Sequence, residues 1–185
     1  MTNKKTVVLG VTGSIAAHKA VDLCGLLTKA GVDVHVVMTE AAQEFISPLP
    51  FKTLSKNPVI ASLYDEEEDW CPTHIQLANR ADLLLIAPAT ANTIAKLAVG
   101  LSGDALGCIA LALNPGARLI IAPALNDKMW QHPATQANVT TLTKRGAQIV
   151  GPVDGELACG YEGLGRLAPI EDIAATALRA VGLAS

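Results

Sequence analysis

A polar segment follows one of the most apolar stretches of the chain and contains Asn126, whose side chain could bind a ligand. The stretch Leu119–Ala122 is apolar throughout, which is typical of a buried parallel strand, and it ends at Pro123. Ligands of open α/β sheets bind beyond the carboxyl ends of the strands, where Asn126 is expected. Its amide offers both an acceptor and a donor, so it can hold a carboxylate without adding charge. An Asx-turn would explain an isolated asparagine better, so a functional interpretation depends on the other strand ends.

A glycine-containing turn follows the first expected strand. Gly10 and Gly13 allow a tight turn, and the free N–H groups of the helix opened by Ser14 and Ile15 can receive a phosphate. The turn lacks the G-x-G-x-x-G spacing of dinucleotide folds, which favours one phosphate over a pyrophosphate. An ordinary strand–turn–helix corner has the same pattern. A ribose contact from Glu40, as in nicotinamide enzymes, ranks low without the third glycine.

Three hydrogen-bonding side chains, Thr90, Asn92 and Thr93, gather after another expected strand. An N-cap accounts for one of them but not for all three. A cofactor with a polar ring edge and a ribityl chain, such as a flavin, would use them all. The chain contains only two Trp, two Tyr and two Phe, so we expect a neighbouring subunit, rather than local aromatic rings, to close over such a cofactor.

Two further side chains could move protons. His74 begins a short helix, and a histidine exchanges protons near neutral pH; an ordinary surface histidine is an equally good interpretation. Cys71 and His74 have a spacing seen in metal sites, but no second pair of ligands accompanies them, so no metal is expected. Cys159 lies among glycines between Asp154 and Arg166, in a loop suited to a lid that places a thiol over a substrate. An incidental thiol in a structural turn is the less favoured alternative.

The composition limits the class of protein. Hydrophobic residues make up 50% of the 185 residues, aromatic residues 3% and charged residues 17%, so we expect apolar surface to be buried between subunits. A net charge of -3 without a basic cluster argues against nucleic acid. No apolar run is long enough to span a membrane, and the polar start is unlike a signal peptide. The four cysteines show no disulfide framework, which indicates a reduced, cytoplasmic protein.

Strands and helices are expected to alternate along the chain, which predicts a doubly wound parallel sheet in a single domain over residues 1–185. Thr73 is expected to cap the helix that contains His74, residues 154–166 are expected to be a loop, and the acidic run 65–69 a solvated loop. The expected strands are 6–11, 32–38, 83–87, 119–122 and 147–150. The expected helices are 15–30, 41–55 broken near Ser47 and Pro48, 74–80, helices through Leu113, one opened by Pro133, and a final one ending near Leu183.

Taken together, these motifs resemble the homo-oligomeric flavin-containing cysteine decarboxylases, most closely the members that act on 4'-phosphopantothenoylcysteine in coenzyme A biosynthesis. The matching segments, in the family's order, are residues 10–19, His74 with the residues after it, 88–93, 123–130 and 155–166. Leu125 stands where the family usually has Met. Ser102, Gly103 and Asp104 stand where the family tends to have paired acids, which leaves Asp104 alone for that role. Many bacterial members carry an additional synthetase domain.

The resemblance implies a flavodoxin-like (Rossmann-like) α/β fold, FMN as cofactor, and trimers that can group into a dodecamer with FMN at the subunit interface. It implies His74 as base, Asn126 as carboxylate-binding residue and Cys159 as proton donor. The FMN contacts that it implies are Gly13, Ser14, Ile15, Thr39, Thr90, Ala91, Asn92, Thr93, Ser102, Asp104 and Ala124. The substrate contacts that it implies are Asn126, Met129, Ala158, Cys159 and Gly160.

The implied reaction avoids an unstabilised carbanion. Oxidation of the cysteine to a thioaldehyde, with His74 removing a proton, provides an electron sink for loss of CO2 from the carboxylate that Asn126 orients. Cys159 would then donate a proton as the enethiol is reduced, which gives 4'-phosphopantetheine with no net redox change. Oxidative decarboxylation of a peptide's C-terminal cysteine, a flavin prenyltransferase, and an FMN-binding regulatory subunit are the alternatives. Cys159 disfavours the first, and the segment around Asn126 disfavours the second.

Overall fold

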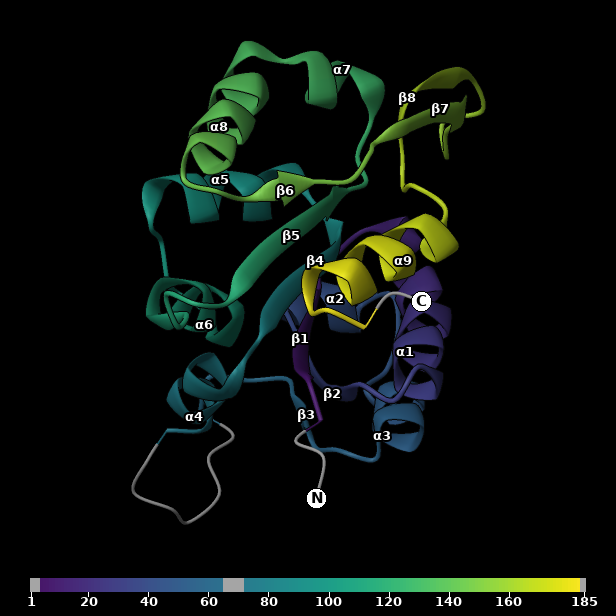
Figure 1. Ribbon diagram of the computed structural model, residues 1–185. Helices are drawn as coiled ribbons and strands as arrows, with labels where there is room; N and C mark the ends of the chain where they lie inside the picture. Colours follow the sequence, from purple (N-terminus) through teal and green to yellow (C-terminus); the bar gives the residue numbers. More distant parts are fainter. Residues whose placement is uncertain (1–3, 65–71, 184–185) are drawn as a thin grey trace.

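The computed structural model describes residues 4–64 and 72–183, and its centre is a parallel six-stranded sheet in the order β3-β2-β1-β4-β5-β6 (Figure 1). Without the two-residue edge strand β3, this is the flavodoxin order, with β1 and β4 side by side. A separate antiparallel pair, β7–β8, stands beyond the carboxyl edge of the sheet. The strands are β1 Thr6–Val11, β2 Asp33–Met38, β3 Val59–Ile60, β4 Leu83–Ala89, β5 Arg118–Pro123, β6 Gln148–Ile149, β7 Val153–Glu156 and β8 Glu162–Arg166.

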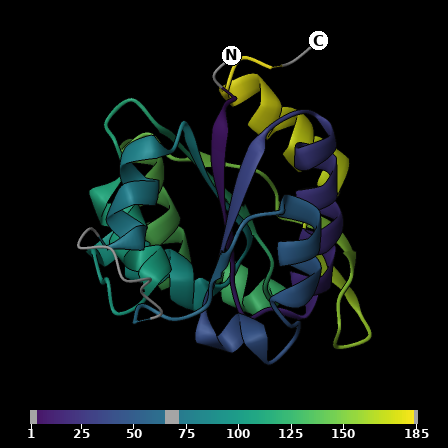
Figure 2. The ribbon, with the colours of Figure 1, turned by 90° about the horizontal axis from the view of Figure 1, so that it is seen from below.

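Helices cover both faces of the sheet, so its central strands contain few polar residues. All residues of β1 and β4 are buried. Val7 and Leu9 pack on one face with α1, α3 and α9, whereas Val8 and Leu84 pack on the other with α4, α5, α6 and α8 (Figure 2). The helices are η1 Ile15–His18, α1 Lys19–Lys29, α2 Glu40–Gln43, α3 Leu49–Ser55, α4 Thr73–Arg80, α5 Ala91–Val99, α6 Ala105–Ala112, α7 Asp127–Gln131, α8 Pro133–Lys144 and α9 Ile170–Ala180.

The expected single-domain, doubly wound sheet is confirmed, and the five predicted strands begin within one residue of β1, β2, β4, β5 and β6. The short edge strand β3 was not predicted. The expected loop over 154–166 was wrong, because most of it pairs as the β7–β8 hairpin. Glycines usually weaken strands, which concealed this hairpin in the sequence. Thr73 is not an N-cap either: it is the first residue of α4, and Pro72 precedes it. The acidic run 65–69 and Cys71 lie outside the described residues.

None of the helices in residues 4–64 and 72–183 is long and apolar enough to cross a membrane.

Candidate functional site

Hydrogen bonds tie together the loops that follow β1, β4 and β5. The buried Thr12 hydroxyl donates to the Pro88 carbonyl at 2.7 Å and accepts the Thr90 N–H at 3.1 Å. The Ser14 hydroxyl reaches the Ala124 carbonyl at 3.4 Å, and the Ala124 N–H donates to the Ala89 carbonyl at 3.0 Å. The glycine-containing turn, the Thr90 segment and the Asn126 segment therefore form one connected surface at the carboxyl edge of the sheet.

Helix N-termini converge on this surface. The N-cap residues of η1, α2, α5, α6 and α7 all lie around one cavity, and each cap side chain accepts a backbone N–H of its own helix. These residues are Ser14, Thr39, Thr90, Asp104 and Asn126. Because the N-terminal N–H groups of a helix carry partial positive charge, several of them around one cavity favour an anion there.

We call this space the strand-end cavity, and it encloses about 560 Å³, within the range of small-molecule sites. The Lys96 ammonium lies 2.9 Å from the Asp104 carboxylate at its wall. Within residues 4–64 and 72–183, no aromatic side chain lines it. The lining residues are Gly13, Ser14, Ile15, Thr39, Glu40, Ala41, Thr90, Ala91, Asn92, Thr93, Lys96, Gly103, Asp104, Ala124, Leu125, Asn126 and Met129.

This lining fits a phosphate-bearing flavin. Thr90 acts as the N-cap of α5, and the Thr93 hydroxyl is 3.1 Å from that of Thr90. The exposed Asn92 has no hydrogen-bond partner in the described part of the chain, so its amide is available to a ligand. Capping thus explains Thr90 but leaves Asn92 free for the polar edge or ribityl chain of a cofactor.

The β7–β8 hairpin rests on the segment between β5 and α7 because two of its positions are glycine. The Leu125 N–H donates to the Gly165 carbonyl at 3.0 Å, and a Cβ at Gly165 would collide with the Leu125 carbonyl oxygen. A Cβ at Gly163 would lie 3.0 Å from that of Asp127. In the sequence these glycines indicated a loop. In the structure they are needed because two backbone segments approach closely there.

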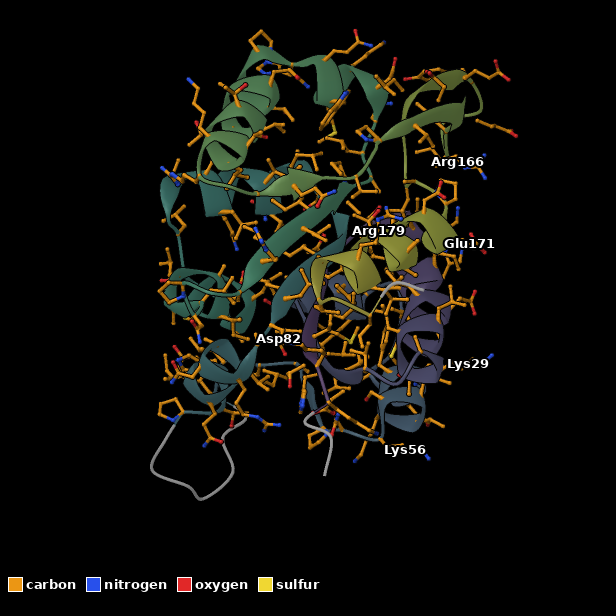
Figure 3. The ribbon with its side chains drawn as sticks, in the orientation of Figure 1. Lys29, Lys56, Asp82, Arg166, Glu171 and Arg179 are labelled. Carbon is orange, nitrogen blue, oxygen red and sulfur yellow. The ribbon has the colours of Figure 1, made fainter. Side chains whose placement is uncertain are left out.

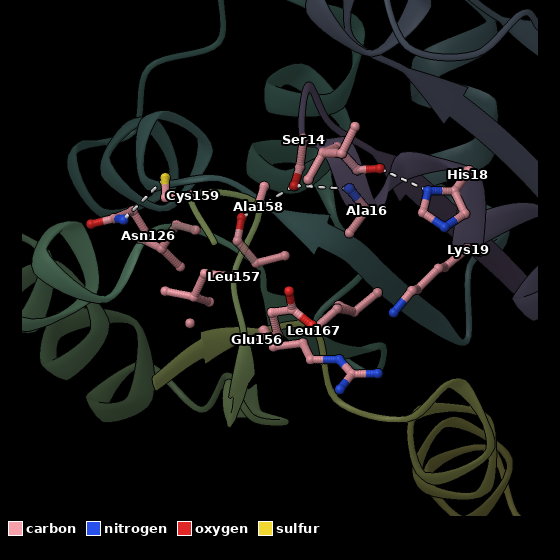
Figure 4. A pocket seen from close by; sticks show the side chains of 15 residues that line it. Ser14, Ala16, His18, Lys19, Asn126, Glu156, Leu157, Ala158, Cys159 and Leu167 are labelled. Carbon is pink, nitrogen blue, oxygen red and sulfur yellow. Dashed lines mark hydrogen bonds between the residues drawn. The ribbon is translucent and has the colours of Figure 1, made fainter. Parts of the chain in front are cut away.

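Cys159 and Asn126 meet under this hairpin. The Asn126 Nδ2 lies 3.8 Å from the Cys159 Sγ, and both side chains line a second cavity (Figure 4). We call it the hairpin cavity; it encloses about 230 Å³. It shares the wall formed by Ser14, Ile15, Ala124, Leu125 and Asn126 with the strand-end cavity. A molecule in either cavity therefore lies beside Asn126.

Tyr161 connects the hairpin to α7 with one hydroxyl group. This hydroxyl accepts a hydrogen bond from Asn126 Nδ2 at 2.7 Å and donates one to Asp127 Oδ1 at 2.7 Å. The Asp127 carboxylate, by accepting that bond, raises the pKa of Tyr161 above its ordinary value. Because the side-chain Oδ1 of Asn126 already accepts the Lys128 N–H at 3.0 Å, the orientation of the amide is fixed at both ends.

The structure brings most of the predicted site residues to these two cavities. Ala158 and Cys159 line the hairpin cavity, and Gly160 is the next residue in its turn. Ser102 precedes the Gly103–Asp104 wall, and its carbonyl accepts a hydrogen bond from Cys108 Sγ at 3.3 Å. The other predicted cofactor and substrate residues line the strand-end cavity, the hairpin cavity or both.

His74 is the exception. It lines neither cavity, and Figure 1 places α4 at the opposite end of the molecule from α7 and the hairpin. Within one chain, His74 and Asn126 therefore do not form a common site.

Several side chains that line the two cavities or contact Asn126 gave no clear signal in the sequence. Tyr161 stands next to the conspicuous Cys159–Gly160 pair, but its partners Asn126 and Asp127 are more than thirty residues away. Lys96 lies one helical turn after Asn92 and Thr93, and that spacing alone could have indicated it. His18, Lys19, Glu156 and Arg166 enter the hairpin cavity only through the tertiary fold.

Metal ligands do not gather in the part of the chain that the structure describes: no three His, Cys, Asp or Glu side chains there could hold an ion. Cys71, whose spacing from His74 was weighed in the sequence as a weak metal signal, is outside that part.

The fold and the two adjoining cavities define the class: an α/β protein with a ligand site at the carboxyl edge of a flavodoxin-like sheet. The chain belongs to the Flavoprotein family, whose model matches residues 1–182. The family supports a flavin cofactor.

Two relatives show how the chain compares with longer and shorter proteins. A coenzyme A biosynthesis bifunctional protein CoaBC from Haemophilus influenzae is 45% identical over 171 residues, which cover 92% of this chain and 42% of that protein. A probable phosphopantothenoylcysteine decarboxylase from Streptococcus mutans is 46% identical over 169 residues, covering 91% and 94%. The chain thus spans less than half of the bifunctional relative and nearly all of the shorter one.

Solved structures share the fold over almost the whole chain. A cysteine-to-serine variant of a PPC decarboxylase complexed with pantothenoylaminoethenethiol matches with a TM-score of 0.84 at 33% identity, covering 95% of this chain and 97% of that one. The FMN binding protein AtHal3 matches with a TM-score of 0.81 at 34% identity, covering 95% of each.

Proposed function

We propose that this protein decarboxylates 4'-phosphopantothenoylcysteine to 4'-phosphopantetheine, with FMN as cofactor. The observation that carries the proposal is the approach of Asn126 to Cys159 beside a wall shared with the strand-end cavity. The names of the relatives and the related complex with an enethiol support it. As a step of coenzyme A biosynthesis, the reaction would take place in the cytoplasm.

The strand-end cavity would hold FMN. Its phosphate would meet the N–H groups at the start of η1, next to Gly13, Ser14 and Ile15, and its polar edge would be within reach of Asn92. Bound FMN would supply an acceptor for hydride from the cysteine and return it later, so the overall reaction needs no external reductant.

The side chains under the hairpin would handle the substrate. Asn126, with Oδ1 held by the Lys128 N–H, presents Nδ2 to the substrate carboxylate beside Cys159. An amide can bind that carboxylate without the charge repulsion an acid would add. The Cys159 thiol, which is exposed in the hairpin turn, would donate a proton to the enethiol after CO2 has left.

His74 would act as the base from a neighbouring subunit of a homo-oligomer. This oligomer would be a trimer, or a dodecamer assembled from trimers. Its distance from Asn126 within one chain supports this arrangement. So does the apolar surface: Val99, Leu101 and Leu111 are each more than half exposed.

The direct test incubates the purified, FMN-loaded protein with 4'-phosphopantothenoylcysteine and measures CO2 and the mass of the product. We expect one CO2 released per 4'-phosphopantetheine formed. Release of CO2 from a peptide with a C-terminal cysteine, but not from this substrate, would contradict the proposal.

A further inference from the structure

The hairpin cavity has different chemistry at its two ends (Figure 4). Asn126 and Cys159 lie at one end. At the other end, the Lys19 side chain extends into the cavity from the start of α1, beside His18. Arg166, on β8, is a second cationic residue in the lining, and Glu156 is its only acidic residue in the described part of the chain. The reacting end is therefore separated from a cationic end within one cavity.

The charged groups of Lys19 and Arg166 take part in no ion pair within residues 4–64 and 72–183. In residues 4–64 and 72–183, neither Lys19 nor Arg166 makes an ion pair or a side-chain hydrogen bond, whereas Lys5 and Lys96 are paired with Asp82 and Asp104. The absence of a partner leaves the positive charge of Lys19, which is only partly exposed, available to a ligand. Such a charge inside a cavity is screened less than one on an open surface.

His18 contributes differently. Its Nδ1 lies 2.8 Å from the Ile15 carbonyl oxygen, which can only accept, so Nδ1 carries the hydrogen. In the neutral ring, Nε2 is then an acceptor and cannot donate to an anion. Lys19 and Arg166 are the side chains of this lining that carry a positive charge and donate hydrogen bonds throughout the neutral pH range.

The middle of the cavity is lined mainly by aliphatic side chains, with Glu156 beside them (Figure 4). Leu157, Ala158 and Leu167 lie between its two ends. A ligand that matches the whole cavity has a carboxylate and a thiol at one end, an aliphatic amide chain in the middle, and a strong anion at the other end.

We propose that Lys19 and Arg166 form a subsite for the phosphoryl group of the substrate, and so select phosphorylated acyl-cysteines over unphosphorylated ones. This rests on the proposed function. The phosphoryl group carries nearly two negative charges at neutral pH, which the two cations match, whereas Glu156 opposes it. Nothing in the proposal requires a bond to be made or broken at this end.

Binding tests the subsite independently of turnover. The affinities of the FMN-loaded protein for 4'-phosphopantothenate and for pantothenate are measured by calorimetry, in the wild type and in Lys19→Met, Arg166→Gln and Glu156→Gln. Lys19→Met and Arg166→Gln should each weaken binding of the phosphorylated ligand about 10- to 100-fold, the worth of a charge-assisted hydrogen bond, and leave pantothenate unchanged. Glu156→Gln should strengthen binding of the phosphorylated ligand alone.

Lys29→Met is the matched control, because Lys29 also belongs to α1 but points away from the molecule (Figure 3). It should change neither affinity. Equal weakening of both ligands by Lys19→Met, or no weakening of either, would overturn the subsite.

Turnover separates this proposal from the proposed function. If the wild type binds the phosphorylated ligand through Lys19 but releases no CO2 from 4'-phosphopantothenoylcysteine, the subsite stands and the function is wrong. If CO2 is released with equal kcat/KM from the phosphorylated and unphosphorylated substrates, the function stands and the subsite is wrong.

Discussion

Asn126 performs two tasks with the two ends of one amide group. Its Oδ1 caps α7 by accepting the Lys128 N–H, and its Nδ2 reaches Tyr161 and Cys159 on the hairpin. The helix therefore determines which end of the amide faces the hairpin. An aspartate would keep the cap, because Asp and Asn are comparable N-cap residues, but would place a negative charge beside the substrate carboxylate.

At this scale of single residues, Cys159→Ser should separate CO2 loss from the final reduction. A hydroxyl group is a far weaker acid than a thiol, so a serine should protonate the enethiol poorly. We expect CO2 to be released and a product lighter than 4'-phosphopantetheine by the mass of H2 to accumulate, as measured by mass spectrometry. Formation of the normal product at the normal rate would remove Cys159 from the reaction.

The contact between Tyr161 and Asp127 should be visible in a titration. The hydrogen bond to Asp127 raises the pKa of Tyr161. This hydrogen bond is therefore fully present below the ordinary tyrosine pKa of about 10, and it is lost as the pH rises through the raised pKa. In a Tyr64→Phe background, only Tyr161 titrates, since the chain has two tyrosines. Asp127→Asn should then shift the phenolate absorbance curve to lower pH; an unchanged curve would rule out the contact.

At the scale of elements, the position of the hairpin depends on Gly165. In Gly165→Ala, the new Cβ would collide with the Leu125 carbonyl oxygen, so β8 must move or the chain must absorb strain of about 1–3 kcal/mol. We expect a lower melting temperature and faster proteolytic cleavage within residues 153–166.

Gly25→Ala provides the control for a glycine that no close approach requires. A Cβ there would lie 3.8 Å from Leu54 Cδ1, an ordinary contact inside α1. This substitution should stabilise the protein by up to about 1 kcal/mol. A Gly165→Ala protein as stable as Gly25→Ala would contradict the role of Gly165.

The elements also differ in how well the sequence predicted them. The continuous apolar runs of β1 and β4 identify strands buried on both faces. The hairpin has no such run. Gly165 is required there because the Leu125 backbone lies too close for a Cβ, although glycine has a low strand propensity. The site shows the same division: strand-end residues such as Asn126 were found from their place after a strand, whereas Tyr161 and Lys19 depend on contacts between distant segments.

At the scale of the whole molecule, the separation of His74 from Asn126 predicts that two inactive variants can complement each other. His74→Asn and Asn126→Asp should each abolish CO2 release in a pure oligomer. If each site takes its histidine and its asparagine from different chains, random mixed oligomers should regain about one quarter of the wild-type activity.

This experiment compares co-expressed variants, whose oligomers are mixed, with separately purified variants combined under conditions that prevent subunit exchange. The separately purified variants should stay inactive. Co-expressed oligomers without activity would indicate that both residues serve the same site from one chain, or that one of them serves none.

Five residues both cap helices and line the strand-end cavity, which restricts how such a site can change during evolution. Replacing Ser14, Thr39, Thr90, Asp104 or Asn126 by a residue that cannot cap costs about 1 kcal/mol of stability before any effect on ligand binding. Ile15, Asn92 and Met129 line the same cavity without capping a helix. New ligand preferences should therefore arise first at these three positions, while the capping residues drift little.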